Sequence, residues 1–184
     1  MSNYQHSEIA ARNCTLVLSG VRAIFLEVLL VAATVVLPVI AHLVGAPVRV
    51  LLPMHWPVIL AGLVYGWRGG ALTGLFAPIA SYLISGLPLP IILPSMTAEL
   101  FMYGLVTGLF REKAGFNSFL STAVALALGR GVFIVSVLLG NVVSTSRLEY
   151  FKAALLPGLI AAAGQIILLP FLAHWWVSHE QRKK

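Results

Sequence analysis

Several runs of about twenty residues in this chain contain no charged side chain or almost none, and this feature restricts its fold more than any other. A helix of about twenty apolar residues crosses a hydrocarbon layer roughly 30 Å thick. Apolar residues make up 59% of the 184-residue chain and charged residues only 10%, which leaves too few polar groups to cover a soluble surface. The sequence therefore predicts an integral membrane protein.

We expect the apolar runs to be helices. They lack the sustained alternation of membrane β-strands, and an isolated sheet would leave unpaired backbone groups in lipid. Interior prolines such as Pro38, Pro78 and Pro157 are tolerated where neighbouring helices satisfy the freed backbone groups. The predicted fold is an all-α bundle of six transmembrane helices. Their ranges are 19–44, 52–67, 70–86, 94–111, 117–140 and 152–177.

The distribution of Lys and Arg predicts which ends of the helices face the cytoplasm. If the N-terminus is cytoplasmic, the outer segments hold Arg49, Arg147 and Lys152. The inner segments then hold Arg12, Arg22, Arg68, Arg111, Lys113, Arg182, Lys183 and Lys184. Because cytoplasmic segments carry the excess of positive charge, we predict an N-in/C-in topology. The basic residues are dispersed and not interleaved with aromatic residues, so no nucleic-acid partner is expected.

The chain is divided into three parts by polarity. Residues 1–18 are too polar to begin a cleaved signal peptide and are expected to form a cytoplasmic interfacial helix. Residues 19–177 form the membrane domain, and residues 178–184 form a basic cytoplasmic tail. Cys14 is the only cysteine, so an intramolecular disulfide and a Cys/His metal site are excluded and a reduced thiol is expected.

The sequence Pro-Met-His-Trp-Pro at residues 53–57 is predicted to begin the second span at its outer end, since proline suits the first turn of a helix. Trp56 and Trp67 then lie near the two membrane interfaces, where indole rings are favoured. His55 has two interpretations. It is either a solvated interfacial side chain or a group that contacts a ligand.

The outer half of the fourth predicted span carries a polar stripe. Ser95, Glu99 and Tyr103 follow one another at intervals of four and share one helical face, which must point into the bundle. A carboxylate in the hydrocarbon region costs several kcal/mol unless it is paired. Arg130 is its expected partner, and Glu27 is an alternative partner for Arg130. A structural ion pair and a role in holding a polar ligand both remain open.

Pairs of small residues one turn apart predict close packing between helices. They are Gly70 and Gly74, Gly104 and Gly108, Ala125 and Gly129, and Gly158 and Ala162.

Catalytic motifs are not found in the chain. HExxH, GxSxG and paired carboxylates are missing, and without a Walker sequence the chain cannot hydrolyse ATP itself. A channel is disfavoured because no internal repeat supplies rings of charge or carbonyl groups. We therefore expect neither an enzyme nor a bound cofactor, but a small bundle with a polar mouth on its outer side.

Three segments carry a resemblance to a known family. LLPMHWPVILAGLVYGWRGGALTGLFAPIASYLISGLPLP, PSMTAELFMYGLVTGLF and ALGRGVF resemble substrate-binding S components of energy-coupling factor (ECF) vitamin transporters. The resemblance spans nearly the whole chain and implies vitamin uptake across the bacterial cytoplasmic membrane. It implies six helices, cytoplasmic termini, and an extracellular vitamin site built from the first, third and fifth loops and the outer halves of helices four to six. It also implies that residues 86–93 act as a lid.

The resemblance also implies partners, namely a membrane T subunit and two ATPases. In many members, alanines one turn apart on the first helix contact the T subunit. Here Ala32 and Ala33 are followed four residues later by Val36 and Leu37, so the central motif is missing. A solitary S component, as in the cobalamin-specific BtuM-like group, is the alternative.

Cobalamin or a related corrinoid is the predicted substrate, and other vitamins remain open. In the BtuM-like group a cysteine of the third helix ligates cobalt, whereas the corresponding region here reads FAPIASYL, with Ala80 at a plausible position. The chain belongs to another branch, lacks the ligand, or brings His55 or Met54 to the metal. The candidate substrate-binding residues are Met54, His55, Ala80, Ser81, Tyr82, Leu89, Ser95, Thr97, Glu99, Tyr103, Arg130 and Asn141. A non-transporting six-helix membrane scaffold is the competing hypothesis.

Overall fold

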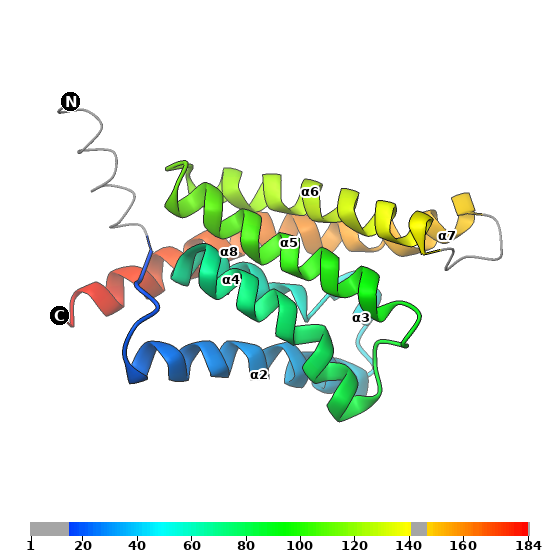
Figure 1. The fold of residues 1–184 in the computed structure, drawn as a ribbon, viewed down its shortest axis with the longest axis horizontal. Coiled ribbons are helices and arrows are strands. Elements are labelled where there is room, and N and C mark those ends of the chain that lie inside the picture. Colours follow the sequence, from blue (N-terminus) through cyan, green and yellow to red (C-terminus); the bar gives the residue numbers. More distant parts are fainter. Residues whose placement is uncertain (1–14, 141–146, 184) are drawn as a thin grey trace.

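The computed structural model describes residues 15–140 and 147–183. The helices in these two ranges are α2 (Val21–Leu43), α3 (Val48–Leu51), α4 (His55–Ser85), α5 (Leu93–Glu112), α6 (Ser118–Leu139), α7 (Arg147–Leu155) and α8 (Gly158–Gln181). No strand occurs in them, which confirms the expected all-helical class. Figure 1 shows the long helices running along one bundle, with α3 and α7 at one end and the C-terminus at the other.

Four stretches of the described chain are long and apolar enough to cross a membrane. They are Val21–Leu43, Val48–Ser85, Ser118–Leu139 and Glu149–Gln181. The surfaces of α2 and α8 expose large apolar side chains such as Phe25, Leu29, Phe171 and Trp175. An apolar surface of this extent is expected where helices face lipid, and the protein is a multi-pass membrane protein.

Helix α4 consists of two halves that meet at Gly66 and lie side by side. Gly66 has φ 71° and ψ −164°, a conformation that is essentially restricted to glycine. A Cβ added at Gly70 would lie 2.7 Å from the Cα of Gly62, whereas eight residues of a straight helix extend about 12 Å. The chain therefore reverses at Gly66, and the two halves correspond to the predicted helices 52–67 and 70–86.

Glycines allow the second half of α4 to touch α5 backbone to backbone. A Cβ added at Gly70 would overlap the carbonyl group of Gly104, and one added at Gly74 would overlap that of Leu100. A Cβ at Gly108 would overlap the backbone of Trp67. The close packing predicted for Gly70 and Gly74, and for Gly104 and Gly108, is confirmed. Lipid tails are as apolar as leucine, so such contacts contribute more to helix association in a membrane than the exclusion of water does.

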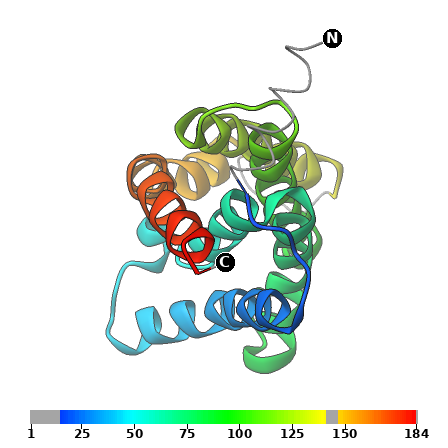
Figure 2. The ribbon, with the colours of Figure 1, turned by 90° about the vertical axis from the view of Figure 1, so that its left-hand side faces the viewer.

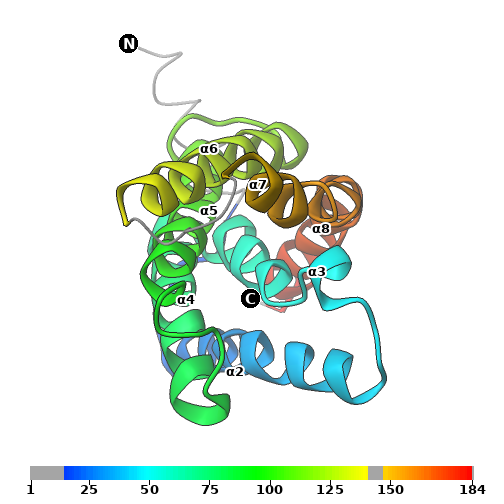
Figure 3. The ribbon, with the colours of Figure 1, turned by 90° about the vertical axis from the view of Figure 1, so that its right-hand side faces the viewer.

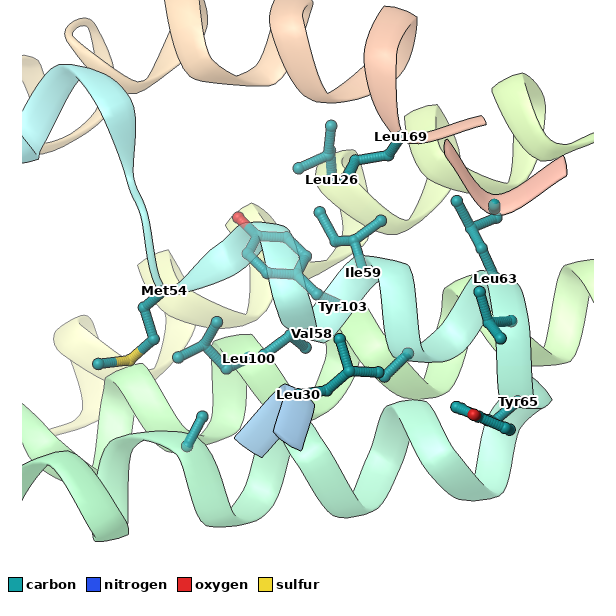
Figure 4. Packing of buried hydrophobic residues seen from close by; sticks show 14 of the residues in the cluster. Leu30, Met54, Val58, Ile59, Leu63, Tyr65, Leu100, Tyr103, Leu126 and Leu169 are labelled. Atoms are coloured by element: carbon teal, nitrogen blue, oxygen red, sulfur yellow. The ribbon is translucent and has the colours of Figure 1, made fainter. Parts of the chain in front are cut away.

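The buried core lies around the first half of α4, as Figure 4 shows. Val58, Ile59 and Leu63 of this half are fully buried. Leu30 of α2, Leu100 of α5, Leu126 of α6 and Leu169 of α8 belong to the same cluster. The first half of α4 is therefore at the centre of this core, and α2, α5 and α8 pack on α4.

Some predicted helix boundaries are wrong. The predicted helix 152–177 is broken, because α7 ends at Leu155 and α8 begins only at Gly158. Pro157 lies between them, and its fixed φ and missing N–H favour a new helix start over continuation. Helix α8 also continues to Gln181, into the segment predicted as a separate tail. The short helix α3 was not predicted.

The N-terminal segment packs on the end of the bundle that Figure 2 shows facing the viewer. Residues 15–18 are not helical, contrary to the helix predicted there, and the rest of that helix and Cys14 lie outside the described residues. The Leu16 N–H donates a hydrogen bond to the Val64 carbonyl (2.6 Å), which holds the segment against α4. At the same end, Arg22 of α2 pairs with Glu180 of α8 at 2.8 Å.

We predict that Gly104→Ala destabilises the bundle, because its Cβ would overlap the backbone of Gly70. Overpacking of this kind costs about 1–3 kcal/mol. The matched control is Gly131→Ala, since a Cβ at Gly131 meets nothing within 4 Å and alanine favours a helix over glycine. Thermal unfolding in detergent should show a lower melting temperature for Gly104→Ala only. Equal melting temperatures would contradict the backbone contact between α4 and α5.

Candidate ligand cavity and its buried ion pair

A cavity of about 430 Å³ lies at the end of the bundle that Figure 3 shows facing the viewer. Its walls come from the last turns of α2, from α3, from both ends of α4 and from the first turn of α5. Most of the lining side chains are aliphatic or proline. Its other lining residues are His42, Met54, His55, Ser81, Ser85 and Met96.

Local backbone features bring these segments together. Helix α2 ends before Gly45, which has φ 68°, and α3 ends at Leu52 in the left-handed region with φ 46°. The Trp56 indole N–H donates to the Leu51 carbonyl (2.8 Å) and fixes the start of α4 against α3. Gly86, with φ 73°, ends α4 and donates its N–H to the Tyr82 carbonyl (2.8 Å). Gly45 and Gly86 suit their turns because glycine adopts positive φ without steric cost.

His55 lines the cavity and is only 3% exposed. Neither of its ring nitrogens has a hydrogen-bond partner among the described residues. Its Nε2 lies 3.9 Å from Glu99 Oε1, too far for a hydrogen bond, and its ring centroid lies 5.3 Å from that of Tyr103. The solvated interfacial interpretation of His55 is therefore wrong, because the side chain is buried.

Glu99 lies behind His55 and is also 3% exposed. Its Oε1 accepts a hydrogen bond from the Tyr103 hydroxyl (2.6 Å) and lies 2.9 Å from Arg130 Nη1. The predicted Glu99–Arg130 ion pair and the shared buried face of Ser95, Glu99 and Tyr103 are confirmed. A buried carboxylate with one cation and one hydroxyl donor is satisfied within the protein itself.

The alternative pairing of Arg130 with Glu27 is wrong. Glu27 Oε1 instead accepts a hydrogen bond from the Thr73 hydroxyl (2.6 Å), at the contact between α2 and α4. A Cβ added at Gly69 would lie 3.2 Å from Glu27 Oε2, so glycine leaves room for the carboxylate.

The predicted site residues fall into three groups. Met54, His55 and Ser81 line the cavity, and Glu99, Tyr103 and Arg130 form the hydrogen-bonded group behind it. Six further residues are not among the described lining residues. They are Ala80, Tyr82, Leu89, Ser95 and Thr97, together with Asn141, which lies outside the described residues.

The reasons for this placement differ from residue to residue. The Thr97 hydroxyl donates to the Leu93 carbonyl (2.7 Å), one turn earlier in the same helix. Leu89 is 55% exposed, and Ser95 is buried in the bundle. A residue at the right height in the membrane therefore need not reach the cavity.

Sequence reasoning missed His42, Ser85 and Met96 as lining residues. His42 lies in the last turn of α2, and Ser85 ends α4, so both are polar groups at the outer end of a predicted span. That position was a usable signal. For Met96 the sequence contains no such signal, because an apolar residue near the start of a membrane helix has no distinguishing feature.

The fold and the cavity define a class of protein, a multi-pass helical membrane protein with a ligand-sized cavity at one end of its bundle. A model of the family described as ECF transporter, substrate-specific component, matches residues 22–176, and the chain belongs to this family. Members of this family are components of transporters and not enzymes. No curated protein and no solved structure matches the chain.

We predict that Arg130→Ala lowers the free energy of unfolding by up to about 3–5 kcal/mol, because it leaves the Glu99 carboxylate buried without a cation. The double variant Arg130→Ala/Glu99→Gln should recover part of this loss, since the uncompensated charge is gone. Thermal unfolding of the single and double variants in the same detergent measures the difference. A double variant that is less stable than Arg130→Ala would contradict the pairing.

Proposed function

We propose that this protein takes up a vitamin, or a small molecule of similar size, across the bacterial cytoplasmic membrane by binding it in the outer cavity. One observation carries the proposal. In a chain of the substrate-specific ECF family, a buried histidine that has no hydrogen-bond partner within residues 15–140 and 147–183 lines a ligand-sized cavity at one end of the bundle. The family match favours this function over a non-transporting scaffold.

The proposed topology has six membrane-crossing segments and both termini in the cytoplasm. The two halves of α4 count as two segments, together with α2, α5, α6 and α8. Figure 1 supports this arrangement, because the start of α2 and the end of α8 lie at the same end of the bundle, opposite the cavity. Arg22, Arg111 and Arg182 lie at helix ends on this side, as the excess of positive charge inside predicts.

Residues 86–93 are the proposed lid of the cavity. Leu87 and Pro88 of this segment line it, and the chain between α4 and α5 is not helical. Gly86 lies at the hinge, where its positive φ ends α4. A segment attached at both ends to firmly packed helices, with apolar side chains over the opening, suits closure over a bound ligand.

The cavity volume bears on the substrate. Pockets of about 300–1,000 Å³ hold drug-sized ligands, and about 430 Å³ lies in the lower part of that range. Cobalamin is far larger than such ligands, so the volume favours a smaller vitamin. Cobalamin stays a prediction, and Met54 and His55 are the lining residues that would approach its cobalt.

The proposed partners are a T subunit and two ATPases, since substrate-specific components supply recognition and an energising module supplies ATP hydrolysis. Val36 and Leu37 of α2 are 50% and 40% exposed. They occupy the positions where alanines would let a T subunit approach this helix most closely. Docking through this surface would be looser than through a pair of alanines. A solitary carrier remains the second arrangement, and the missing alanines favour it.

We expect a fluorescent reporter fused to the C-terminus to lie in the cytoplasm, and one inserted at residues 145–150 to lie outside. The reason is the excess of Lys and Arg at the proposed inner end. A reporter inserted after Lys113 is the matched control and should also be cytoplasmic. Protease accessibility in intact cells and in inverted vesicles reads out each position. The reverse pattern would overturn the topology.

Uptake and binding test the function. Cells that require an external vitamin and lack its native carrier should grow on low concentrations of one vitamin when they express this chain. With the vitamin that supports growth, His55→Ala should weaken binding to the purified protein about 5- to 150-fold, because a polar contact worth about 1–3 kcal/mol is lost. Lys113→Ala, at the far end of α5, is the control and should bind unchanged. Growth on no vitamin, with no binding by titration calorimetry, would reject the proposal.

A further inference from the structure

The wall of the cavity carries no fixed charge among the described residues. None of its lining residues is Asp, Glu, Lys or Arg. Glu99 and Arg130 lie 2.9 Å from each other, and neither lines the cavity. Arg49 of α3, next to the lining residue Val48, is exposed and is not a lining residue either. A carboxylate or phosphate entering this space would lose water and find no fixed countercharge. Such a transfer is costly, because a desolvated charge needs a partner.

The imidazole of His55 is the polar side chain of the wall with two unpartnered buried nitrogens among the described residues, and the hydroxyl of Ser81 is a further polar group there. Since Arg130 already balances the charge of Glu99, the site requires no charge on His55. Neither ring nitrogen has a hydrogen-bond partner among the described residues, and a buried polar group left in this state is destabilising. A neutral imidazole has one donor and one acceptor nitrogen. The complementary ligand group is therefore one that can both donate and accept, such as an amide, a lactam or a hydroxyl group.

Other polar side chains in the wall are less available. The Ser85 hydroxyl donates to the Ser81 carbonyl (2.8 Å) and accepts from the Leu87 N–H (3.4 Å). His42 is exposed and keeps access to solvent in the structure. The ligand surface away from His55 therefore meets mainly apolar groups.

The apolar part of the wall suits a flat ring. Met54 and Met96 lie on it from the two helix starts, and thioethers make favourable contacts with aromatic rings. Pro38 and Leu52 contribute further apolar surface. A ring system in this space buries apolar surface on several sides, while one heteroatom-bearing edge reaches His55.

We infer that the cavity takes an uncharged, mostly apolar ring molecule with an edge that donates and accepts hydrogen bonds at His55, and that it discriminates against carboxylate and phosphate forms of the same molecule. The inference rests on the proposed function and narrows its substrate class. It also assigns His55 as the specificity-determining residue for this edge.

Matched pairs of molecules test the inference, in each of which one member carries a carboxylate or phosphate where the other has an uncharged group. The probes are nicotinamide and nicotinate, lipoamide and lipoate, and riboflavin and riboflavin 5′-phosphate, each titrated into the purified full-length protein by calorimetry. The uncharged member of at least one pair should bind, and at least tenfold more tightly than its ionised partner. An ionised member that binds as well as or better than its uncharged partner overturns the inference while leaving the proposed function intact. Binding by no uncharged probe overturns the inference as well, and the growth assay then decides the function separately.

Two variants separate charge selection from loss of folding. Val39→Lys adds a cation to a lining position that is already 40% exposed, and it should reduce the preference for the uncharged member by at least tenfold. His55→Gln keeps a donor and an acceptor and should retain binding within about tenfold, whereas His55→Leu should lose it. Unchanged preference in Val39→Lys, with a melting temperature like that of the parent, would contradict the charge argument. Equal binding by His55→Leu and the parent would contradict the assigned role of His55.

Discussion

A carboxylate buried inside an apolar bundle is the constraint on which the half of this structure that holds the cavity depends. Glu99 cannot stay ionised there without a cation, and Arg130 supplies it from the neighbouring helix at 2.9 Å. The pairing sets how closely α5 and α6 approach. A Cβ at Gly129 would overlap the Tyr103 ring, and one at Gly158 would lie 2.6 Å from the Arg130 guanidinium. The small residues of α6 and α8 thus stand where the ion pair needs space.

Helix α5 carries a second carboxylate at its other end, and the two carboxylates lie near the two ends of the first half of α4. Glu112 Oε2 accepts a hydrogen bond from the Trp67 N–H (3.3 Å), at the start of the second half of α4, where backbone N–H groups have no helical partner. A Cβ at Gly66 would overlap this carboxylate, so the reversal of the chain and the capping group occupy the same place. Glu99 lies beside His55 at the start of the first half. Between Glu99 and Glu112, the glycine contacts fix the register of α4 on α5. They thereby fix the position of His55 in the cavity wall.

The sequence predicts the features that depend on local spacing, and misses those that depend on which helix ends meet. Residues four apart share a helical face wherever the helix lies, so the stripe of Ser95, Glu99 and Tyr103 could be predicted, as could the glycine pairs. Thr97 is at the same height, but its hydroxyl turns back to its own helix. The cavity joins the end of α2 to both ends of α4, and no pattern within one helix specifies such a meeting. Pro157 was misjudged because proline is tolerated inside some membrane helices, as Pro38 and Pro78 are here.

The contrast between Glu99 and Glu27 shows which of the long helices around the cavity is held less firmly. Glu99 has a cation and a hydroxyl donor, whereas Glu27 of α2 accepts one hydrogen bond from Thr73, and its Oε2 has no partner among the described residues. Only five of the 23 residues of α2 are buried, against 17 of 31 in α4. Helix α2 therefore has fewer buried contacts and weaker polar anchoring than the α4–α5 pair. Because its last turns supply Pro38, Val39 and His42 to the cavity, displacing this wall costs less than displacing the wall that α4 and α5 supply.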